Sequence, residues 1–336
     1  MKFTAALFSL VAAVASVKAL PSGADPDFTI SQADLDGALT CPGRASYMGV
    51  KNPLLLVPGT GTTGAESWDN SFAKVAPSLG FEPCYISPAP YLLNDTTLSA
   101  QYFVNAVRRL TAESGKAVPV MGWSQGNLII QTALTFYPQV RSKVDRFISF
   151  AGDFRGTTRV GLLLSLTSNK QVPPSVWQQA KGSQLLTALA NAGGLNAIVP
   201  TTSIYSTSDE IVQPEDSTPS ASSYLNGATN VLAQTYCKGI SIFHGGQLYS
   251  NFTFSVAKNA LQSSDKVWDP SAFNKGYCGG YVADGLQPSD KDAVQSAVLA
   301  DLGRLTSAQY SVPCEPVLPA YAKKYASANP PCHAAV

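Results

Sequence analysis

The sequence predicts an α/β fold with a mostly parallel central sheet and helices on both of its faces. Short apolar runs bounded by turn residues alternate with segments of helical spacing along the chain, and this alternation is typical of parallel sheets covered by helices. The apolar runs resemble strands that are buried on both faces. No internal repeat, low-complexity tract or linker divides residues 20–336, so we expect a single domain after a leader at residues 1–19.

The first strands and helices are expected before residue 116. Residues 53–59 (PLLLVPG) have the pattern of a buried strand, and residues 66–79 have helical spacing that ends at Gly80. Residues 83–88 (PCYISP) predict a second strand. Residues 96–115 predict a helix that ends at Gly115, with these side chains near one face: Leu98, Phe103, Val104, Val107 and Leu110.

The alternation continues through the middle of the chain. Residues 117–123 (AVPVMGW) predict a strand, and residues 125–138 predict a helix that is broken by Pro138. Further strands are expected at residues 146–152 (RFISFAG), 201–206 (TTSIYS) and 239–244 (GISIFH). Ligands of such sheets bind at the carboxyl ends of the strands, where we expect Gly59, Ser124, Asp209 and His244.

The N-terminal residues have the pattern of a secretory signal. Lys2 supplies the positive charge, residues 4–14 are apolar, and small residues follow, so cleavage is expected after Ala15 or Ala19. The apolar run is shorter than the about 20 residues that span a bilayer. We therefore expect a secreted protein without a membrane span.

The composition argues against several kinds of partner. Hydrophobic residues make up 45% of the chain and charged residues 13%, whereas an average globular protein has about 25% charged residues. The net charge of +1 gives no electrostatic reason to expect nucleic acid or an anionic membrane as partner. We expect a monomer that uses no cofactor.

The cysteines indicate an oxidising compartment, because their number is even and leaves no thiol over. The six are Cys41, Cys84, Cys237, Cys278, Cys314 and Cys332. They can pair in many ways, and their spacing alone leaves the pairing open. The chain has no C-x-x-C spacing and only two histidines, so we expect no metal site. Of two N-x-S/T sequons, the one at Asn94 lies in a polar loop and is the expected glycosylation site.

The pentapeptide GWSQG, residues 122–126, contains the candidate nucleophile. G-x-S-x-G between a strand and a helix is the pattern of a nucleophile elbow, a sharp turn that presents a serine. Gly122 and Gly126 fit this turn because side chains at these positions would collide with neighbouring backbone. The predicted strand before Ser124 and the predicted helix after it supply the required context.

A serine hydroxyl needs a base to take its proton, and histidine is the usual base. His333 lies close to the C-terminus, where the chain is expected to fray. His244 closes the predicted strand at residues 239–244 and leads into Gly245 and Gly246, so a loop could carry it to Ser124. His244 is therefore the expected base.

A carboxylate should orient the histidine, and in hydrolases with this elbow it lies between the serine and the histidine in chain order. Asp209 comes soonest after the predicted strand at residues 201–206. It would hold the imidazole in the right tautomer and stabilise the imidazolium. Glu210 and Asp153 are alternatives that spacing leaves open.

An oxyanion hole needs N–H donors aimed at the developing negative charge. The residue after the nucleophile, Gln125, normally gives its backbone N–H, and a second donor comes from the loop after an early strand. Residues 57–64 (VPGTGTTG) form such a loop, in which Thr60 can offer both N–H and hydroxyl. A phosphate-binding loop would need a lysine followed by Ser or Thr, and this segment has none.

Several segments of the chain, in order from Leu20 onward, carry a resemblance to a known family. They are LPSGADP, LLLVPGTGTTG, YLLNDT, GWSQG, RSKVDR, PSVWQQ, NAGGL, IVPTT and DEIVQP. Together they resemble the fungal lipase B family of the α/β-hydrolase superfamily. The resemblance implies an α/β-hydrolase fold and a secreted serine lipase or carboxylesterase. Such an enzyme hydrolyses and transesterifies carboxylic esters such as triacylglycerols, so the implied partner is an ester or lipid, with transient contact at a lipid interface.

The resemblance also assigns roles to residues. It implies that Ser124, Asp209 and His244 form the catalytic triad, which chooses Asp209 over Glu210, and that Thr60 and Gln125 form the oxyanion hole. It implies a pocket in which Trp123 lies on the alcohol side, and Asp153 and Gln179 on the acyl side. It further implies a glycan at Asn94 and three disulfides: Cys41 with Cys84, Cys237 with Cys278, and Cys314 with Cys332.

The chain departs from the family at several positions. Gly122 stands where the family has threonine. Residues 158–171 resemble a small mobile helix at the pocket mouth, with a diverged sequence, and residues 292–305 match a more alanine-rich helix that walls the pocket. Whether residues near 160–166 form an interfacial lid is open. Alternative functions are a short-chain carboxylesterase, a peptidase on the same scaffold, or a hydrolase-like binding protein.

Overall fold

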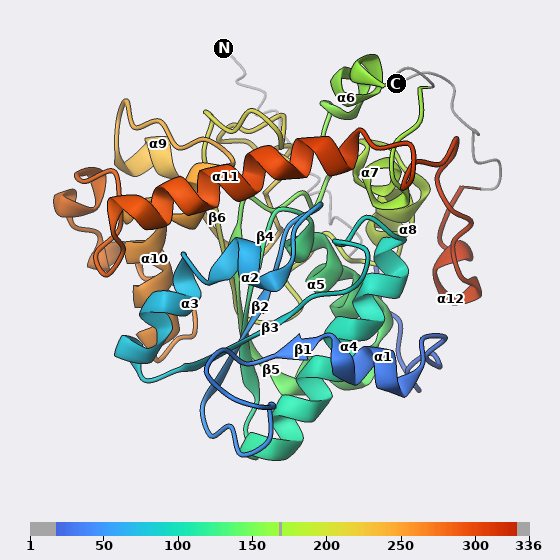
Figure 1. The fold of residues 1–336 in the computed structure, drawn as a ribbon, viewed down its shortest axis with the longest axis horizontal. Coiled ribbons are helices and arrows are strands. Elements are labelled where there is room, and N and C mark those ends of the chain that lie inside the picture. Colours follow the sequence, from blue (N-terminus) through green and yellow to red (C-terminus); the bar gives the residue numbers. More distant parts are fainter. Residues whose placement is uncertain (1–17, 168–169, 328–336) are drawn as a thin grey trace, which may run out of the picture.

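The computed structural model describes residues 18–167 and 170–327 (Figure 1). The predicted leader up to residue 17, His333 and Cys332 lie outside the described residues. No helix within the described ranges is both long enough and apolar enough to cross a membrane.

The core of the fold is a seven-stranded sheet with strand order β1-β3-β2-β4-β5-β6-β7. The strands are β1 (Leu39–Thr40), β2 (Pro53–Val57), β3 (Glu82–Ile86), β4 (Val118–Trp123), β5 (Val144–Phe150), β6 (Thr201–Tyr205) and β7 (Thr229–Leu232). Only the short edge strand β1 pairs antiparallel, and every other pair is parallel. The predicted α/β fold with a mostly parallel sheet is confirmed.

The helices and short 3-10 helices (η) are bounded as follows: α1 (Gln32–Gly37), α2 (Gly64–Trp68), α3 (Phe72–Val75), η1 (Ala76–Leu79), α4 (Thr96–Ser114), α5 (Gln125–Phe136), η2 (Pro138–Lys143), α6 (Val160–Leu166), α7 (Pro174–Gln179), α8 (Gln184–Asn191), α9 (Ala233–Tyr236), η3 (Gly245–Leu248), α10 (Asn251–Gln262), η4 (Pro270–Ala272), η5 (Lys275–Cys278), α11 (Pro288–Leu305) and α12 (Ala320–Lys323). Figure 1 shows α4 and α5 on one side of the sheet and α3 and α10 on the other. The helix α11 crosses the top of the sheet, with α6 above one end of it.

The apolar strands explain why both faces are covered. Successive residues of a strand point to opposite faces, so Leu55 packs in the cluster that includes Phe103 of α4. Leu54 packs in the cluster that includes Phe72 of α3. All five residues of β2 are buried, as expected for a strand between two helical layers.

Two expectations about individual elements need correction. The predicted helix at residues 66–79 is split into α2, α3 and η1, because Ser71 leaves the helical conformation (φ −138°, ψ −133°) and its hydroxyl donates to the Leu248 carbonyl. Gly80 does end this segment, in the left-handed region. The predicted strand at residues 239–244 was wrong, because this segment is a loop. Its Ile240 carbonyl accepts a hydrogen bond from the Gln234 side chain and not from a neighbouring strand.

Two disulfides join distant parts of the chain. Cys41 pairs with Cys84 and Cys237 with Cys278, each across about forty residues of sequence. These two pairings confirm what the resemblance implied. The third implied pairing, of Cys314 with Cys332, reaches outside the described residues.

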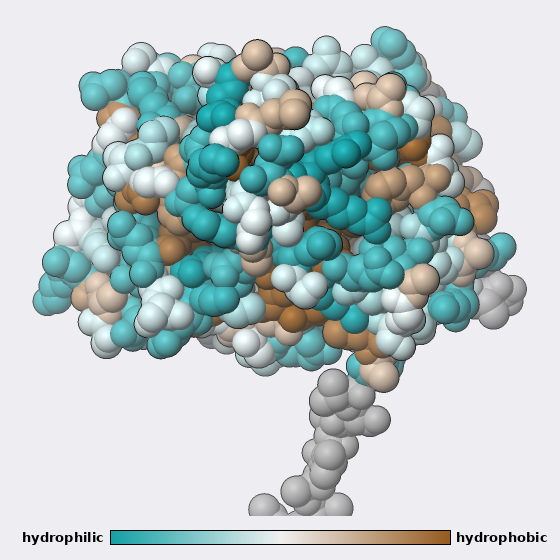
Figure 2. All heavy atoms as spheres, turned by 90° about the horizontal axis from the view of Figure 1, so that it is seen from below, coloured by the Kyte–Doolittle hydropathy of each residue, from teal (hydrophilic) through white to brown (hydrophobic). Residues whose placement is uncertain are grey.

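The outer surface is uneven in hydropathy. The face seen from below in Figure 2 is dominated by hydrophilic and intermediate residues, with hydrophobic residues in small, separate groups. Among the large hydrophobic side chains that are exposed, four belong to α6 and α11: Leu162, Leu166, Leu299 and Leu302. All four line one cavity, which is described below.

Candidate active site

Ser124 occupies a strained turn between β4 and α5. Its backbone lies in the left-handed region (φ 54°, ψ −130°), which a residue with a side chain seldom adopts. Its N–H donates to the Phe150 carbonyl of the adjacent strand at 3.0 Å. A Cβ at Gly126 would lie 2.3 Å from the Val57 carbonyl oxygen, so only glycine fits there. The GWSQG segment thus has the strand-turn-helix geometry predicted for it.

Three side chains form a continuous hydrogen-bonded chain at this turn. The His244 Nε2 lies 2.9 Å from the Ser124 Oγ, and its Nδ1 lies 2.8 Å from the Asp209 Oδ2. All three residues are buried, so water competes little for these contacts. The fold thereby brings together three predicted residues from the ends of β4, β6 and the loop before η3.

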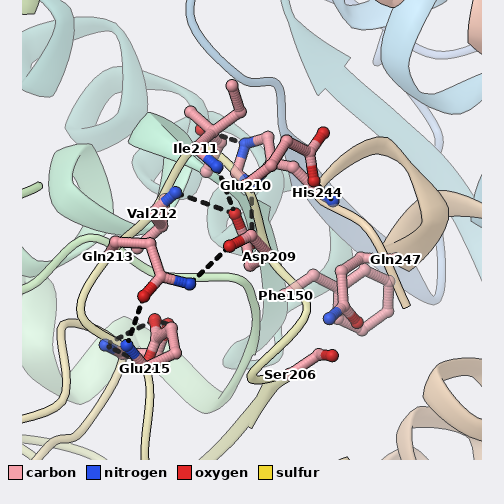
Figure 3. A network of polar contacts seen from close by, with 12 residues as sticks. Phe150, Ser206, Asp209, Glu210, Ile211, Val212, Gln213, Glu215, His244 and Gln247 are labelled. Atoms are coloured by element: carbon pink, nitrogen blue, oxygen red, sulfur yellow. Dashed lines mark hydrogen bonds and ion pairs between the residues drawn. The ribbon is translucent and has the colours of Figure 1, made fainter. Parts of the chain in front are cut away.

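The loop after β6 holds the Asp209 carboxylate by backbone donors (Figure 3). Its Oδ1 accepts the N–H groups of Ile211 at 2.9 Å and Val212 at 2.7 Å, while Oδ2 faces the imidazole. The Gln213 side-chain amide donates to the Asp209 carbonyl oxygen. These donors fix the orientation of the carboxylate so that Oδ2 faces the imidazole.

Glu210 lies next to the base but contacts its backbone. The Glu210 Oε2 accepts the His244 N–H at 2.9 Å, and the Trp123 Nε1 donates to the His244 carbonyl at 3.2 Å. The Trp123 ring also lies 5.2 Å from the imidazole, centroid to centroid. These contacts fix the loop on both sides of His244. Of the two neighbouring acids, Asp209 is the one that reaches the imidazole.

The pKa of His244 is set by opposing effects. Burial lowers it, but the charge of Asp209 and the hydrogen bond to Asp209 act in the other direction, and the net result lies above the ordinary value of 6.5. Glu210 and Asp153 add to the increase. The imidazolium is therefore favoured beside Ser124, as a base requires when it takes a proton.

The two candidate oxyanion donors are Gln125, the residue after Ser124, and Thr60, which shares a cavity with Ser124. Gln125 is the first residue of α5, so its N–H has no acceptor inside the helix and lies at the positive end of the helix dipole. Thr60 lines the same cavity as Ser124. The Thr60 hydroxyl lies 3.0 Å from Nε2 and 3.1 Å from Oε1 of the Gln179 side chain, and this amide also donates to the Ser175 carbonyl at 3.0 Å. Gln179 thus orients Thr60.

A cavity of about 310 Å³ opens above Ser124 and His244. It is lined mainly by apolar side chains of α6 and α11, together with Trp123, Thr60 and Gln179. The exposed leucines of α6 and α11 belong to this lining. Such a cavity can hold an apolar chain attached to a carbonyl group at Ser124.

Asp153 differs from the other predicted pocket residues in its position. It is fully buried and is not part of the cavity lining, and neither of its carboxylate oxygens has a hydrogen-bond partner among the described residues. Burial raises the pKa of Asp153 to about 7, against the opposing charge of His244. Asp153 makes no hydrogen bond to His244, so the structure does not bring it into the hydrogen-bonded chain.

Sequence reasoning did not single out two residues of α11 that reach the site. Asp301 lines the cavity, and Arg304 donates to the Gly61 carbonyl at 2.6 Å, next to Thr60. A signal was available in the helix pattern. Val294, Val298, Asp301 and Leu305 are spaced by four, three and four residues, which places a charged residue on the inward face of the helix.

Nothing in the described ranges suggests a metal centre. Across residues 18–167 and 170–327, no three side chains of His, Cys, Asp or Glu are grouped so that they could hold an ion.

Comparison with known proteins extends this picture. The chain is 45% identical over 329 residues to lipase B of Pseudozyma antarctica, covering 97% of this chain and 95% of that protein. The crystal structure of Aspergillus fumigatus lipase B superposes with a TM-score of 0.81 at 31% identity, covering 90% of this chain and 74% of that one. No family model matches the chain.

Proposed function

The chain belongs to the lipase B family and is a lipase or carboxylic ester hydrolase, and from this premise we propose that it is a secreted enzyme acting through an acyl-enzyme on Ser124. The observation that carries the proposal is the hydrogen-bonded chain from the Ser124 Oγ through both nitrogens of His244 to Asp209. A serine so connected can lose its proton as it attacks.

In the proposed first step, the Ser124 Oγ attacks the ester carbonyl carbon while the His244 Nε2 takes the hydroxyl proton. The carbonyl oxygen becomes an oxyanion, which the N–H of Gln125 and the N–H and hydroxyl of Thr60 stabilise. When the tetrahedral intermediate collapses, His244 returns the proton to the leaving alcohol and the acyl group stays on Ser124. Asp209 keeps the imidazole in the orientation that allows both transfers.

In the second step, a water molecule attacks the acyl carbonyl and His244 again acts as base. The acid is released and the Ser124 hydroxyl is restored. Another alcohol in place of water gives a new ester, so the same site would perform transesterification. The positive end of α5 and the fixed donors favour the oxyanion in both steps.

The cavity suits esters with a long, mainly apolar chain, and we propose triacylglycerols as an example. Its lining is mainly apolar, and exposed leucines of α6 and α11 surround its mouth. Contact of these leucines with an oil surface would bury apolar area. Rates on esters of increasing chain length, measured below and above their solubility limit, would test this. A rate that rises sharply at the limit supports a lipase with an interfacial lid, and an unchanged rate supports a short-chain carboxylesterase.

Secretion is proposed from the leader pattern at residues 1–19 together with the two disulfides, which persist in oxidising compartments. Asn94 is exposed and is the proposed glycan site. The proposal takes the enzyme to be a monomer that needs no metal or cofactor.

The Ser124→Ala variant tests the proposed function. Hydrolysis of p-nitrophenyl butyrate should fall by a factor on the order of 10⁴ or more, because the nucleophile is lost, while circular dichroism stays unchanged. Ser149→Ala is the matched control, since Ser149 is a buried serine in the neighbouring strand β5 that makes no side-chain hydrogen bond within the described residues. Equal activity of Ser124→Ala and wild type would refute the proposal.

A further inference from the structure

The wall of the cavity contains an acid where an apolar residue is expected. Along α11, Val294 and Leu305 occupy the same helical stripe as Asp301, and Val298 lies between them. Val294 is buried in the apolar cluster on one face of the sheet, and Leu305 packs against Val160 and Val176. Helix geometry therefore directs Asp301 inward, and it lines the cavity together with Ser124 and His244.

The carboxylate of Asp301 has no protein partner within the described residues. Its Oδ1 is buried without a hydrogen bond, and no ion pair reaches it. The nearest cation in sequence, Arg304, is engaged elsewhere: it pairs with both carboxylate oxygens of Glu66 at 2.7 and 2.9 Å and donates to the Gly61 carbonyl. Its guanidinium also lies 4.1 Å from the centre of the Tyr91 ring. Asp301 is half-buried, and a buried carboxyl oxygen without a hydrogen bond, such as its Oδ1, is costly and uncommon in folded proteins.

The carboxylate also lies against the loop that carries Thr60. A Cβ at Gly61 would lie 1.4 Å from the Asp301 Oδ1, so this oxygen fills the space that a side chain at position 61 would take. Gly61 directly follows Thr60, which lines the cavity. Asp301 and Ser124 thus line one cavity, with the loop of Thr60 between α11 and the nucleophile turn in contact with Asp301.

The surroundings of Asp301 contain charges of both signs. His244 and Arg304 favour its ionised form and Glu66 opposes it, but burial dominates and raises the pKa of Asp301 to about 8. Glu210 and Arg159 line the same cavity. Near neutral pH the group is mostly a neutral carboxylic acid, which both donates and accepts a hydrogen bond.

We propose that Asp301 is a specificity-determining residue that selects esters carrying a hydroxyl group on the chain that lies along α11, over wholly apolar esters of the same length. A substrate hydroxyl in the cavity would pair with the part of the Asp301 carboxyl group that lines it, whereas an apolar chain would exclude water from this group without replacing the hydrogen bond. Sites built to pair a substrate hydroxyl discriminate strongly against analogues that lack it. The inference rests on the proposed ester hydrolysis at Ser124 and names a substrate class for that site.

Competition between matched esters tests the inference. The first comparison sets ethyl octanoate against a series of ethyl hydroxyoctanoates, each with a hydroxyl group at a different carbon of the acyl chain. The second sets butyl octanoate against the mono-octanoate of butanediol, which places the hydroxyl group on the alcohol side. For at least one pair, we expect the ratio of kcat/KM, hydroxylated over apolar, to be about tenfold higher in the wild type than in Asp301→Leu.

Two isosteric variants separate shape from hydrogen bonding. Asp301→Leu keeps the branched shape without polar atoms, and should lose the preference. Asp301→Asn keeps a donor and an acceptor, and should retain most of it. Val298→Ala, one turn earlier on the same stripe, is the control: it removes apolar surface from the same wall and should change both rates by the same factor.

The pH dependence of the ratio gives an independent reading. An apolar chain binds less favourably next to an ionised Asp301 than next to a neutral Asp301, because the charge loses its contact with water. The ionised group still accepts a hydrogen bond from a substrate hydroxyl. In the wild type the ratio should therefore rise as pH increases through about 8, whereas in Asp301→Asn it should stay flat. The titration of His244 affects both esters and cancels in the ratio.

The possible outcomes separate the role of Asp301 from the proposed ester hydrolysis at Ser124. If the wild type hydrolyses the esters and Asp301→Leu leaves both ratios unchanged, the inference is overturned and the esterase function stands. If Asp301→Asn shows the same pH dependence of the ratio as the wild type, the assignment to Asp301 is overturned. If the wild type hydrolyses none of the esters, the proposed function fails and the inference fails with it.

Discussion

The loop after β6 and the helix α11 both bring an acid toward His244, and they provide opposite surroundings for it. Asp209 accepts two backbone N–H groups and faces the imidazole. Asp301 accepts no hydrogen bond from any described residue, and burial raises its pKa to about 8. The difference shows how two acids near one histidine can serve differently: Asp209 is held in place by the protein, whereas Asp301 lines the cavity and can pair with a ligand.

The largest expected effect separates Asp209 from its neighbour. Asp209→Asn should lower kcat for p-nitrophenyl butyrate by a factor on the order of 10⁴, because the imidazole loses its charged partner and its tautomer is no longer fixed. Glu210→Gln should cost far less, since an amide oxygen can still accept the His244 N–H. Steady-state kinetics on both variants measures this difference. Equal losses would contradict the distinction between the two acids.

A second prediction concerns the contact between α11 and the loop that carries Thr60. Arg304→Ala removes the hydrogen bond to the Gly61 carbonyl and the pair with Glu66, so Thr60, the proposed oxyanion donor, should be less well ordered. We expect kcat to fall about tenfold with little change in KM.

The control for Arg304→Ala is Lys74→Ala, which breaks an ion pair with Asp290 at the other end of the same helix. It should lower stability without lowering kcat. If both variants reduce kcat equally, Arg304 acts through the general stability of α11 and has no specific effect on the loop.

A third prediction is that Asp301 makes the free energy of unfolding depend on pH. A folded-state pKa that is raised from 3.8 to about 8 means that the native state binds more protons than the unfolded state between these values, so stability falls as pH rises through that interval. Asp301→Asn removes this dependence. Because one pKa unit corresponds to about 1.4 kcal/mol, urea unfolding should show the variant gaining several kcal/mol over the wild type at pH 8 relative to pH 4. A constant difference across this range would show that Asp301 is not buried in its neutral form.

The smallest expected effect is a shift of the acidic limb of activity. Because Asp209 raises the pKa of His244 above its ordinary value, kcat/KM should decline with falling pH from a point above 6.5, where His244 becomes protonated. The residual activity of Asp209→Asn should decline only at lower pH. A pH profile of each enzyme on a soluble ester tests this, and identical limbs would contradict the assigned cause.

The sequence predicted the fold and the hydrogen-bonded chain well for physical reasons that can be named. Buried strands such as β2 and β4 are apolar along their whole length, and Gly126 is required by contact with the Val57 carbonyl, so the elbow leaves a local signature. His244 was found by exclusion, since the chain has only two histidines. Its role as a catalytic base remains a prediction.

Other features depend on tertiary contacts that leave weaker local signals. Ser71 interrupts a helical pattern because its hydroxyl donates to the distant Leu248 carbonyl. Residues 239–244 alternate like a strand, but the edge of the sheet is occupied by β7. Asp301 follows the apolar spacing of α11, and only the cavity shows why a charged residue there matters.

The most direct test of the central claim is to trap the acyl group. When enzyme and excess p-nitrophenyl butyrate are mixed and quenched within milliseconds, we expect a burst of about one equivalent of p-nitrophenol. We also expect a butyryl adduct, seen by mass spectrometry, on the peptide that contains Ser124. Hydrolysis that proceeds without an adduct on that peptide, or an equal burst from Ser124→Ala, would show that Ser124 is not the nucleophile.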